Sequence, residues 1–351
     1  MKILVNASHP KLKNYGGVAN HLRGLEPYLP KNFHFNTIGK RFPKKGSGKY
    51  WLPWDVMKFT FKLVMLRPDF VWLNPSLNKN ALRRDLVFLR LAHALGVKAA
   101  VFIHGFDARY YETCDKQWLS NNLNKATLIF VLASEFKKKL KDAGITTPIE
   151  LTTTKVEDTL LRDFDIASRD GRQGDLLFLS RIERAKGVYE TIKTFRILQK
   201  EIPDLKLNIV GAGSELENVR ALVRKEHLSG VNVAGRLSGK ALLEAYKAAK
   251  ILLLPSFHGE GMPTVVLEGM AFGLVVISRP VGGLVDFFEN GKMGQIDETL
   301  DPAKIADNVR PFLQHPDLAK KVAHYNHEYA KKHFLASSVV QKMEETFSKY
   351  L

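Results

Sequence analysis

The sequence predicts an α/β protein that contains two doubly wound parallel-sheet domains. Short apolar runs alternate with helical patterns along the 351 residues. The runs are rich in Val, Ile, Leu and Phe without alternation, which is typical of strands buried on both faces of a parallel sheet. The length suits two domains of roughly 150–200 residues each. Alternation of strands and helices indicates a doubly wound sheet in each half.

Ten apolar runs are predicted as strands: residues 2–6, 33–38, 70–74, 99–104 and 127–133 in the first half, and 175–180, 205–210, 231–234, 251–255 and 275–278 in the second. Helical patterns lie between them. In residues 188–199, for example, the apolar side chains recur at helical spacing. From residue 301 onward the pattern is helical.

The turn-rich, charged stretch 155–173 predicts a linker. We therefore expect an N-terminal Rossmann-like domain over 1–165 and a second Rossmann-like domain over 166–335. Residues 336–351 are expected to form a helix that packs back toward the N-terminal domain.

The formal net charge of +17 is unevenly distributed. Residues 1–165 hold 27 Lys and Arg against 14 Asp and Glu (27 − 14 = +13), and the remainder hold 26 against 22 (+4). A basic half predicts an anionic partner, such as a membrane surface, a phosphorylated acceptor or nucleic acid, although the excess can also serve solubility alone. The single cysteine, Cys114, excludes an internal disulfide. No apolar run reaches roughly 18–20 residues, and the polar Asn6 ends the N-terminal run too early for a signal peptide. We expect a cytoplasmic protein, with a peripheral position on the inner membrane face as one option.

Several candidate site residues follow predicted strands, where open α/β sheets bind ligands. Gly16 and Gly17 precede a helix and would let a phosphate or sugar approach its N-terminus, or form a plain turn. His104 ends a strand and could bind a hydroxyl or lie satisfied in the core. Arg181 and Lys186 could clamp a diphosphate.

Two further segments follow strands in the second half. Gly211 opens a Gly-Ala-Gly turn that lacks the third glycine of a dinucleotide fingerprint. The segment 255–268 carries Glu260 in a loop and Glu268 inside a helix that begins near Pro263. The N–H groups of Thr264 and Val265 would point at an anion, and the two carboxylates could bind hydroxyl groups of a sugar and a ribose.

These motifs together resemble the retaining glycosyltransferases of family 4, which have the GT-B fold with two Rossmann-like domains facing a central cleft. The resemblance runs through Gly16-Gly17, His104, residues 180–187, 211–213 and 235–236, the Glu260/Glu268 pair and residues 280–283. It implies that Arg181 and Lys186 bind the donor diphosphate and that Glu268 binds the ribose. Glu260 would contact the donor sugar, residues 233–236 would lie near the base, and His104 would reach the sugar from the opposite domain. On this resemblance, residues 1–165 are expected to bind the acceptor and residues 166–335 the nucleotide sugar. The expected donor-binding residues are Gly16, Gly17, Gly211, Arg236, Gly261, Met262, Pro263, Thr264, Val265 and Glu268.

Three departures from the family pattern stand out. Ser180 replaces a usual glycine, Gly105 replaces a frequent aspartate, and the usual Asn-Gly-Val-Asp stretch is absent around residues 156–165. The last of these blurs the expected domain boundary.

The resemblance implies transfer of a sugar, with retention, from a UDP- or GDP-sugar to an acceptor hydroxyl, in bacterial cell-surface polysaccharide or glycolipid synthesis. No cofactor or metal is required on this interpretation. The acceptor would be a saccharide or a lipid-diphosphate-linked saccharide. The basic, aromatic residues 40–51, and the helix after them with Lys58 and Lys62, suit an anionic membrane interface, or their aromatic side chains belong to the core.

Alternative functions stay open at this point. A nucleotide-sugar epimerase would share the donor contacts but would need no acceptor. A nucleic-acid binder would fit the pI of about 9.7, but no known binding module is evident, so we expect no nucleic-acid partner. Asp163-Phe164-Asp165 spells the metal-binding Asp-x-Asp of other transferases, but it lies in the expected linker.

Overall fold

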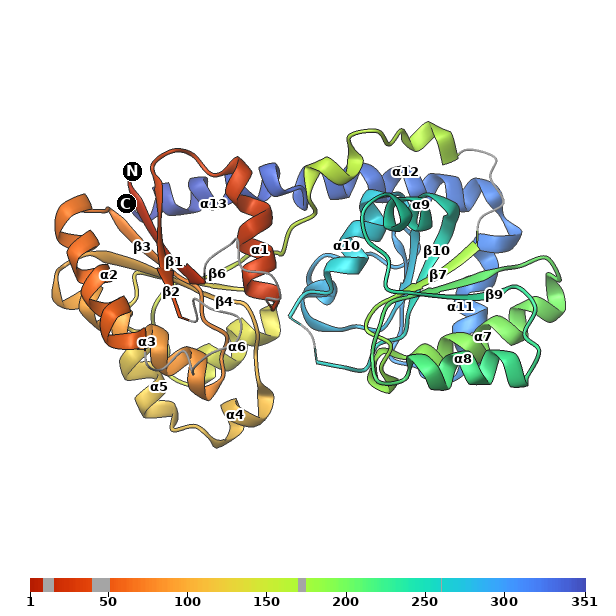
Figure 1. Ribbon diagram of the computed structural model, residues 1–351, viewed down its shortest axis with the longest axis horizontal. Coiled ribbons are helices and arrows are strands. Elements are labelled where there is room, and N and C mark those ends of the chain that lie inside the picture. The colour runs from red at the N-terminus through yellow and green to blue at the C-terminus, as the bar shows by residue number, and fades with distance from the viewer. Residues whose placement is uncertain (9–15, 40–50, 170–174, 260) are drawn as a thin grey trace. The chain divides into compact units, whose positions relative to one another are not determined.

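The computed structural model describes residues 1–8, 16–39, 51–169, 175–259 and 261–351. It contains two compact units (Figure 1). Unit 1 comprises Met1–Lys155, Glu260–Met262 and Ala336–Leu351, and unit 2 comprises Val156–Gly259 and Pro263–Leu335.

Unit 1 is built on a six-stranded, all-parallel sheet in the order β2-β1-β3-β4-β5-β6. The strands are β1 (Ile3–Ser8), β2 (Phe33–Ile38), β3 (Phe70–Leu73), β4 (Lys98–Ile103), β5 (Leu128–Val131) and β6 (Ile149–Leu151). The helices are α1 (Gly17–Leu25), α2 (Leu52–Leu66), α3 (Lys79–Ala94), α4 (Ala108–Thr113), α5 (Lys116–Leu123), α6 (Ser134–Asp142) and α13 (Ala336–Lys349). Strands β3 and β5 are buried at every position, because helices cover both faces of the sheet.

Helix α13 completes unit 1 although it comes from the end of the chain. Phe347 is fully buried, and its ring packs edge-on against those of Phe70, Trp72 and Phe130 at 5.3, 6.1 and 5.7 Å. Beyond the helix, the Tyr350 hydroxyl donates to Glu150 Oε1 at 2.7 Å. These aromatic contacts bury the apolar face that the pattern of residues 336–349 predicts.

Unit 2 repeats this architecture with the sheet order β12-β11-β10-β7-β8-β9, again all parallel. The strands are β7 (Asp175–Leu179), β8 (Leu207–Val210), β9 (Val231–Gly235), β10 (Ala249–Leu254), β11 (Val275–Ser278) and β12 (Gly294–Ile296). The helices are α7 (Val188–Glu201), α8 (Leu216–Lys225), α9 (Lys240–Ala248), α10 (Thr264–Ala271), α11 (Pro302–Gln314) and α12 (Pro316–His333). Short 3-10 turns cover Asp158–Leu161, Ile166–Arg169, Arg184–Lys186 and Gly282–Asp286, and in unit 1 Glu26–Tyr28.

The predicted α/β class is confirmed, and each of the ten predicted strands is present within a few residues of its expected bounds. The sequence analysis missed β6 and β12. Both have three residues and lie at the edge of a sheet, so neither carries a long apolar run.

The two units divide between Lys155 and Val156, whereas the sequence placed the boundary after residue 165. The intervening residues pack on unit 2. The Val156 N–H donates to Phe334 O at 2.7 Å, and the Phe164 ring packs against Phe272 at 4.9 Å and His327 at 5.6 Å. A boundary predicted from turn composition does not take such long-range contacts into account.

Candidate active site

The candidate donor site lies at the carboxyl edge of the unit 2 sheet. The chain runs from β7 outward through β8 and β9 and then returns to β10, so β7 has β8 on one side and β10 on the other. In doubly wound sheets, the crevice for ligands opens at such a reversal of strand order, outside the carboxyl ends. In this sheet the reversal falls between β7 and β10.

The loops that follow β7 and β10 are bonded to each other. The Phe257 N–H donates to Ala185 O at 2.9 Å. Gly187 has φ +79°, and a Cβ there would lie 2.4 Å from Pro255 O, so only glycine fits this close approach. The loop after β7 is therefore held in place from the adjacent strand end.

This loop carries both predicted diphosphate ligands. Arg181 is exposed, and its guanidinium donates to Glu183 Oε1 at 2.7 Å. Lys186 ends a 3-10 turn and is 4% exposed. Arg236 directly follows β9 and Arg279 directly follows β11, while Arg181 follows β7 after Ser180. The carboxyl edge of unit 2 is thus rich in positive charge, which favours an anionic ligand.

Gly211 has a structural role that the sequence left open. Its φ is +147°, and a Cβ would lie 1.8 Å from Ser180 O. Its N–H donates to Gly235 O at 2.8 Å. At Gly213 a Cβ would lie 2.3 Å from Ile182 O. These glycines therefore allow protein backbone to approach the turn after β8 closely.

Helix α10 begins at Thr264, and Pro263 is its N-cap residue. The N–H groups at the start of a helix have no intrahelical acceptor, so those of Thr264 and Val265 are placed to bind an anion. Met262 and Pro263 are buried, and Gly261 is partly exposed. Glu260, which the sequence assigned to the donor sugar, lies outside the described residues.

Glu268 occupies the second turn of α10 and is partly buried. Its Oε2 accepts a hydrogen bond of 2.6 Å from the hydroxyl of Tyr246 on α9. Tyr246 is fully buried and its ring stacks on Phe272 at 5.0 Å. Burial and the adjacent carboxylate raise the pKa of the Tyr246 hydroxyl well above its usual value, so it stays a donor. The sequence analysis missed this tyrosine, which orients the carboxylate.

The Asp163-Phe164-Asp165 motif has a local structural role. Asp165 Oδ1 accepts the Ala167 N–H at 3.0 Å, between two 3-10 turns, and Phe164 packs into unit 2. Within the described ranges no group of three or more His, Cys, Asp or Glu side chains is arranged to hold a metal ion.

Unit 1 has its own reversal of strand order, between β1 and β3. Gly16 is the N-cap of α1 and Gly17 begins the helix. A Cβ at either position would meet no described atom within 4 Å, so packing against the described residues does not require glycine there. Open space at a helix N-terminus is consistent with the approach of a ligand.

His104 follows β4 and is held by neighbouring polar and aromatic groups. Its ring stacks on Phe102 at 3.7 Å, and its Nε2 lies 2.9 Å from Asn74 Oδ1. The Asn74 amide nitrogen donates to the carbonyls of Trp72 and Asn6, so its oxygen faces the histidine. That oxygen can only accept, so His104 carries its proton on Nε2 and presents Nδ1 as an acceptor.

Behind His104 lies a second histidine that the sequence did not single out. His21 on α1 is 4% exposed, and its ring lies 5.0 Å from that of His104. Burial, followed by the charge of Lys155, lowers the pKa of His21 to about 3. Burial and the neighbouring His21 also lower the pKa of His104 well below its usual value. Both imidazoles are therefore neutral at physiological pH.

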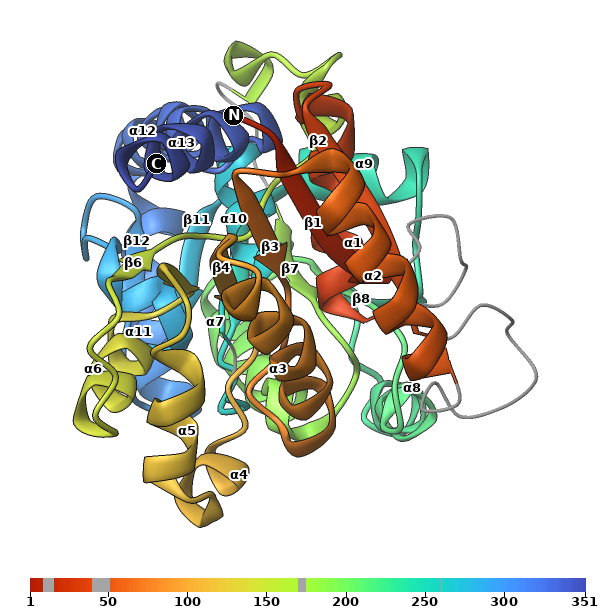
Figure 2. The same ribbon diagram turned by 90° about the vertical axis from the view of Figure 1, so that its left-hand side faces the viewer.

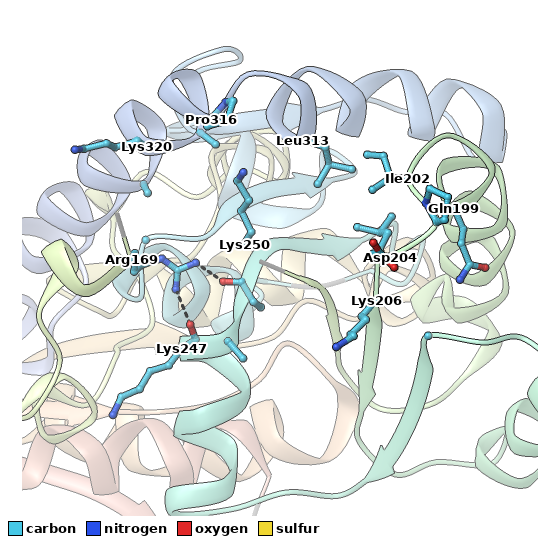
Figure 3. A pocket seen from close by; sticks show the side chains of 18 of the residues that line it. Arg169, Gln199, Ile202, Asp204, Lys206, Lys247, Lys250, Leu313, Pro316 and Lys320 are labelled. Carbon is cyan, nitrogen blue, oxygen red and sulfur yellow. Dashed lines mark hydrogen bonds between the residues drawn. The ribbon is translucent and has the colours of Figure 1, made fainter. Parts of the chain in front are cut away.

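A pocket of about 930 Å³ lies elsewhere in unit 2 (Figure 3). Its lining includes Lys206 before β8, Gly230 before β9 and Gly273 before β11, so it opens at the amino edge of the sheet. Lys250 points into it from β10, and the Arg169 guanidinium is bonded to backbone carbonyls at the end of α9. This pocket is therefore distinct from the carboxyl edge that carries the candidate donor site.

Two doubly wound, all-parallel units in one chain define the GT-B class of fold. The HepE protein of Anabaena, solved in complex with UDP, superposes with a TM-score of 0.72 at 16% identity, over 99% of this chain and 100% of that one. Residues 162–332 match the family model described as "Glycosyl transferases group 1".

Curated relatives match about half of the chain. Glycogen synthase of Mycobacterium tuberculosis is 32% identical over 160 residues, which cover 45% of this chain and 38% of that protein. The capsular polysaccharide biosynthesis glycosyltransferase CapM of Staphylococcus aureus is 24% identical over 177 residues, or 50% of this chain and 46% of CapM. The chain therefore spans less than half the length of these relatives.

Proposed function

We propose that the protein is a retaining glycosyltransferase that moves a sugar from a UDP- or GDP-sugar to an acceptor hydroxyl. The observation that carries this proposal is the carboxyl edge of unit 2, where Arg181, Lys186 and the N-terminus of α10 gather positive charge at the reversal of strand order. The family match of residues 162–332 and the binding of UDP by HepE support it.

Each residue has a distinct role in this proposal. Arg181 and Lys186 bind the diphosphate and stabilise the charge that develops on it as it leaves. Glu268, oriented by Tyr246, accepts hydrogen bonds from the ribose hydroxyls. Arg236 lies near the base, and Glu260 contacts the donor sugar. His104 offers a neutral acceptor, Nδ1, to a substrate hydroxyl.

We further propose that the acceptor oxygen attacks the anomeric carbon from the same face as the departing diphosphate. The bond between the anomeric carbon and the diphosphate oxygen breaks while the acceptor oxygen bonds to that carbon. The acceptor proton passes to the departing phosphate, so the configuration is retained and no protein nucleophile is needed. The two cations carry the electrostatic stabilisation, and the activity is expected to persist in the presence of a chelator.

The acceptor is proposed to be a saccharide or a lipid-diphosphate-linked saccharide used in bacterial polysaccharide or glycolipid synthesis. The excess of +13 over residues 1–165 suits a phosphorylated acceptor and an anionic membrane. The naming of CapM as a capsular polysaccharide enzyme favours the same pathway class.

The test compares turnover and donor affinity in Arg181→Ala and Lys186→Ala. Both are expected to lower kcat by about 100-fold or more, because they remove charge stabilisation from the transition state. Arg196→Ala is the matched control, because Arg196 on α7 is similarly exposed and has an ion pair of the same 2.7 Å length with Glu226, the residue that follows α8. Equal loss of activity in the control would contradict the assignment.

Two further measurements separate this proposal from its alternatives. Free nucleoside diphosphate should appear only when acceptor is present, whereas an epimerase would convert the donor sugar without acceptor. Glu268→Ala is expected to weaken donor binding by about 2–4 kcal/mol in calorimetry. Unchanged affinity would remove Glu268 from the donor site.

A further inference from the structure

The outer face of α2 carries an exposed apolar stripe. In this helix Asp55, Phe59 and Leu63 are buried and face the core of unit 1. On the other side five large apolar side chains are exposed by about half to two-thirds: Trp54 (49%), Met57 (54%), Phe61 (64%), Val64 (58%) and Met65 (66%). At about 100° per residue these five positions fall within an arc of roughly 100°, a single continuous face.

The stripe is exceptional within the described residues. Eleven large apolar side chains are exposed there, and five of them belong to this one helix. Scattered exposed apolar side chains are common, but a contiguous set on one face marks an interaction surface. The sequence left open whether the aromatic side chains of this helix belong to the core. Of the three on α2, Phe59 is buried, whereas Trp54 and Phe61 are exposed.

Two lysines of α2 hold the helix against the sheet. It lies beside β2, the edge strand of unit 1 (Figure 2). Lys58 Nζ donates to Thr37 O at 2.7 Å, and Lys62 Nζ donates to Phe35 O at 2.6 Å. The sequence analysis placed these lysines beside the apolar side chains at an interface, but the structure uses them to cover the carbonyls of the edge strand.

The charge of the sequence that precedes and contains the stripe indicates what the stripe contacts. Residues 40–67 contain eight basic residues and one acidic residue (8 − 1 = +7): Lys40, Arg41, Lys44, Lys45, Lys49, Lys58, Lys62, Arg67 and Asp55. The acidic one is buried and accepts the Gly39 N–H at 2.7 Å. A symmetric dimer through α2 would bring two such basic segments together, which like-charge repulsion opposes. An anionic lipid surface offers the complementary charge and an apolar phase for the stripe.

We propose that α2 docks the protein on an anionic lipid bilayer, lying in the interface with the stripe Trp54, Met57, Phe61, Val64 and Met65 among the acyl chains. This deepens the proposed function, because it rests on the proposal of a lipid-linked acceptor and names the docking element. The protein lies on the bilayer in this inference. Among the helices of the described residues, none has the length and apolar character to cross a membrane.

The experiment measures partition of the full chain onto vesicles by flotation, with no donor or acceptor present. The vesicles are pure phosphatidylcholine, or equal parts phosphatidylcholine and phosphatidylglycerol. The salt concentrations are about 0.1 M and about 1 M, at which charges are screened over about 10 Å and 3 Å. The wild type is expected to bind the anionic vesicles at low salt and to retain measurable binding at high salt, because burial of the stripe is not screened.

The double variant Phe61→Ser/Met65→Ser is expected to lower the partition coefficient by about tenfold or more, since two exposed apolar side chains no longer enter the lipid. Leu95→Ser is the matched control. Leu95 is 50% exposed in the same unit but lies at the end of α3, so this variant should bind like the wild type. Replacing Lys44, Lys45 and Lys49, which are outside the described residues, with Glu should remove only the salt-sensitive component.

Fluorescence gives a direct readout of insertion. Trp54 should move from water into lipid, so the wild type should show a blue shift on anionic vesicles that Trp54→Phe lacks while it still binds. Equal binding by the double variant and the wild type, or equal binding to both vesicle types, would overturn the proposal. So would a wild-type dimer that the double variant dissociates, without vesicle binding by either.

This outcome is separable from that of the proposed function. Donor affinity, measured by calorimetry with UDP- and GDP-sugars, should be the same in the double variant and the wild type. Loss of vesicle binding with normal transfer to a soluble acceptor would support α2 docking, whereas normal vesicle binding without any transfer would contradict only the enzymatic proposal.

Discussion

The buried histidine of unit 1 makes the stability of that unit depend on pH in a defined direction. His21 is 4% exposed, and burial, followed by the charge of Lys155, lowers its pKa to about 3 from the ordinary value of 6.5. Below pH 6.5 the unfolded chain therefore binds a proton at this site that the folded chain does not. Stability is unaffected above pH 7 and is lost as the pH falls below 6.5, until it levels off near pH 3.

The size of this loss of stability follows from the difference between the two pKa values of His21. At pH 4.5 the unfolded site is protonated and the folded site is neutral, which costs about 3 kcal/mol relative to pH 7, at 1.36 kcal/mol for each pKa unit. His21→Phe keeps an aromatic ring beside Phe102 and removes the titrating group. The variant should therefore lose about 3 kcal/mol less stability than the wild type between pH 7 and pH 4.5.

Urea unfolding followed by tryptophan fluorescence is a suitable assay. All four tryptophans, at positions 51, 54, 72 and 118, lie in unit 1, so the signal reports on the unit that contains His21. His93→Phe serves as the control, because it makes the same substitution at an exposed position in the last turn of α3. Equal losses of stability in the wild type and in His21→Phe would refute the argument that His21 is held neutral.

Three other predictions concern contacts within the two units. Tyr246→Phe should keep the stack on its neighbouring ring and weaken donor binding by about three- to tenfold in calorimetry, since the α10 carboxylate loses one hydrogen bond. Gly211→Ala should lower the free energy of unfolding by about 3 kcal/mol in circular dichroism melts, because its Cβ would overlap backbone, whereas Gly16→Ala should change it by less than about 1 kcal/mol. Asn74→Leu should allow both ring tautomers of His104, visible as changed imidazole 15N shifts in NMR, whereas a single tautomer in both proteins would contradict the Asn74 assignment.

The architecture could be predicted because its signals are local. Strands buried on both faces form apolar runs of a few residues, as in Phe70–Leu73 and Ala249–Leu254, and helices between them show their own period. The placement of Arg181, Gly211 and Arg236 at the carboxyl ends of strands follows from the same runs, because each lies within two residues of the end of a strand. The short edge strands β6 and β12 lack such runs and were missed.

The site within unit 1 could not be predicted in the same way. Asn74 lies 30 residues from His104 in the chain, and His21 lies on a helix between β1 and β2. They meet because β1, β3 and β4 are neighbours in the sheet, so their carboxyl ends share one edge. The tautomer of His104 follows from this pairing alone. In unit 2 the hydrogen bond from Tyr246 on α9 to Glu268 on α10 likewise joins residues that are distant in the chain.

The sequence by itself determined the class of fold, most of the strands and the motifs of the proposed donor site, because each depends on neighbours along the chain. Only the tertiary structure decided which strands lie side by side, which polar groups orient His104 and Glu268, and which face of α2 stays exposed. Helical periodicity separates Phe59 from Phe61 onto different faces, but it does not say which face the sheet covers. Which face of α2 is covered depends on its packing against β2 and α3, and these contacts belong to the tertiary structure.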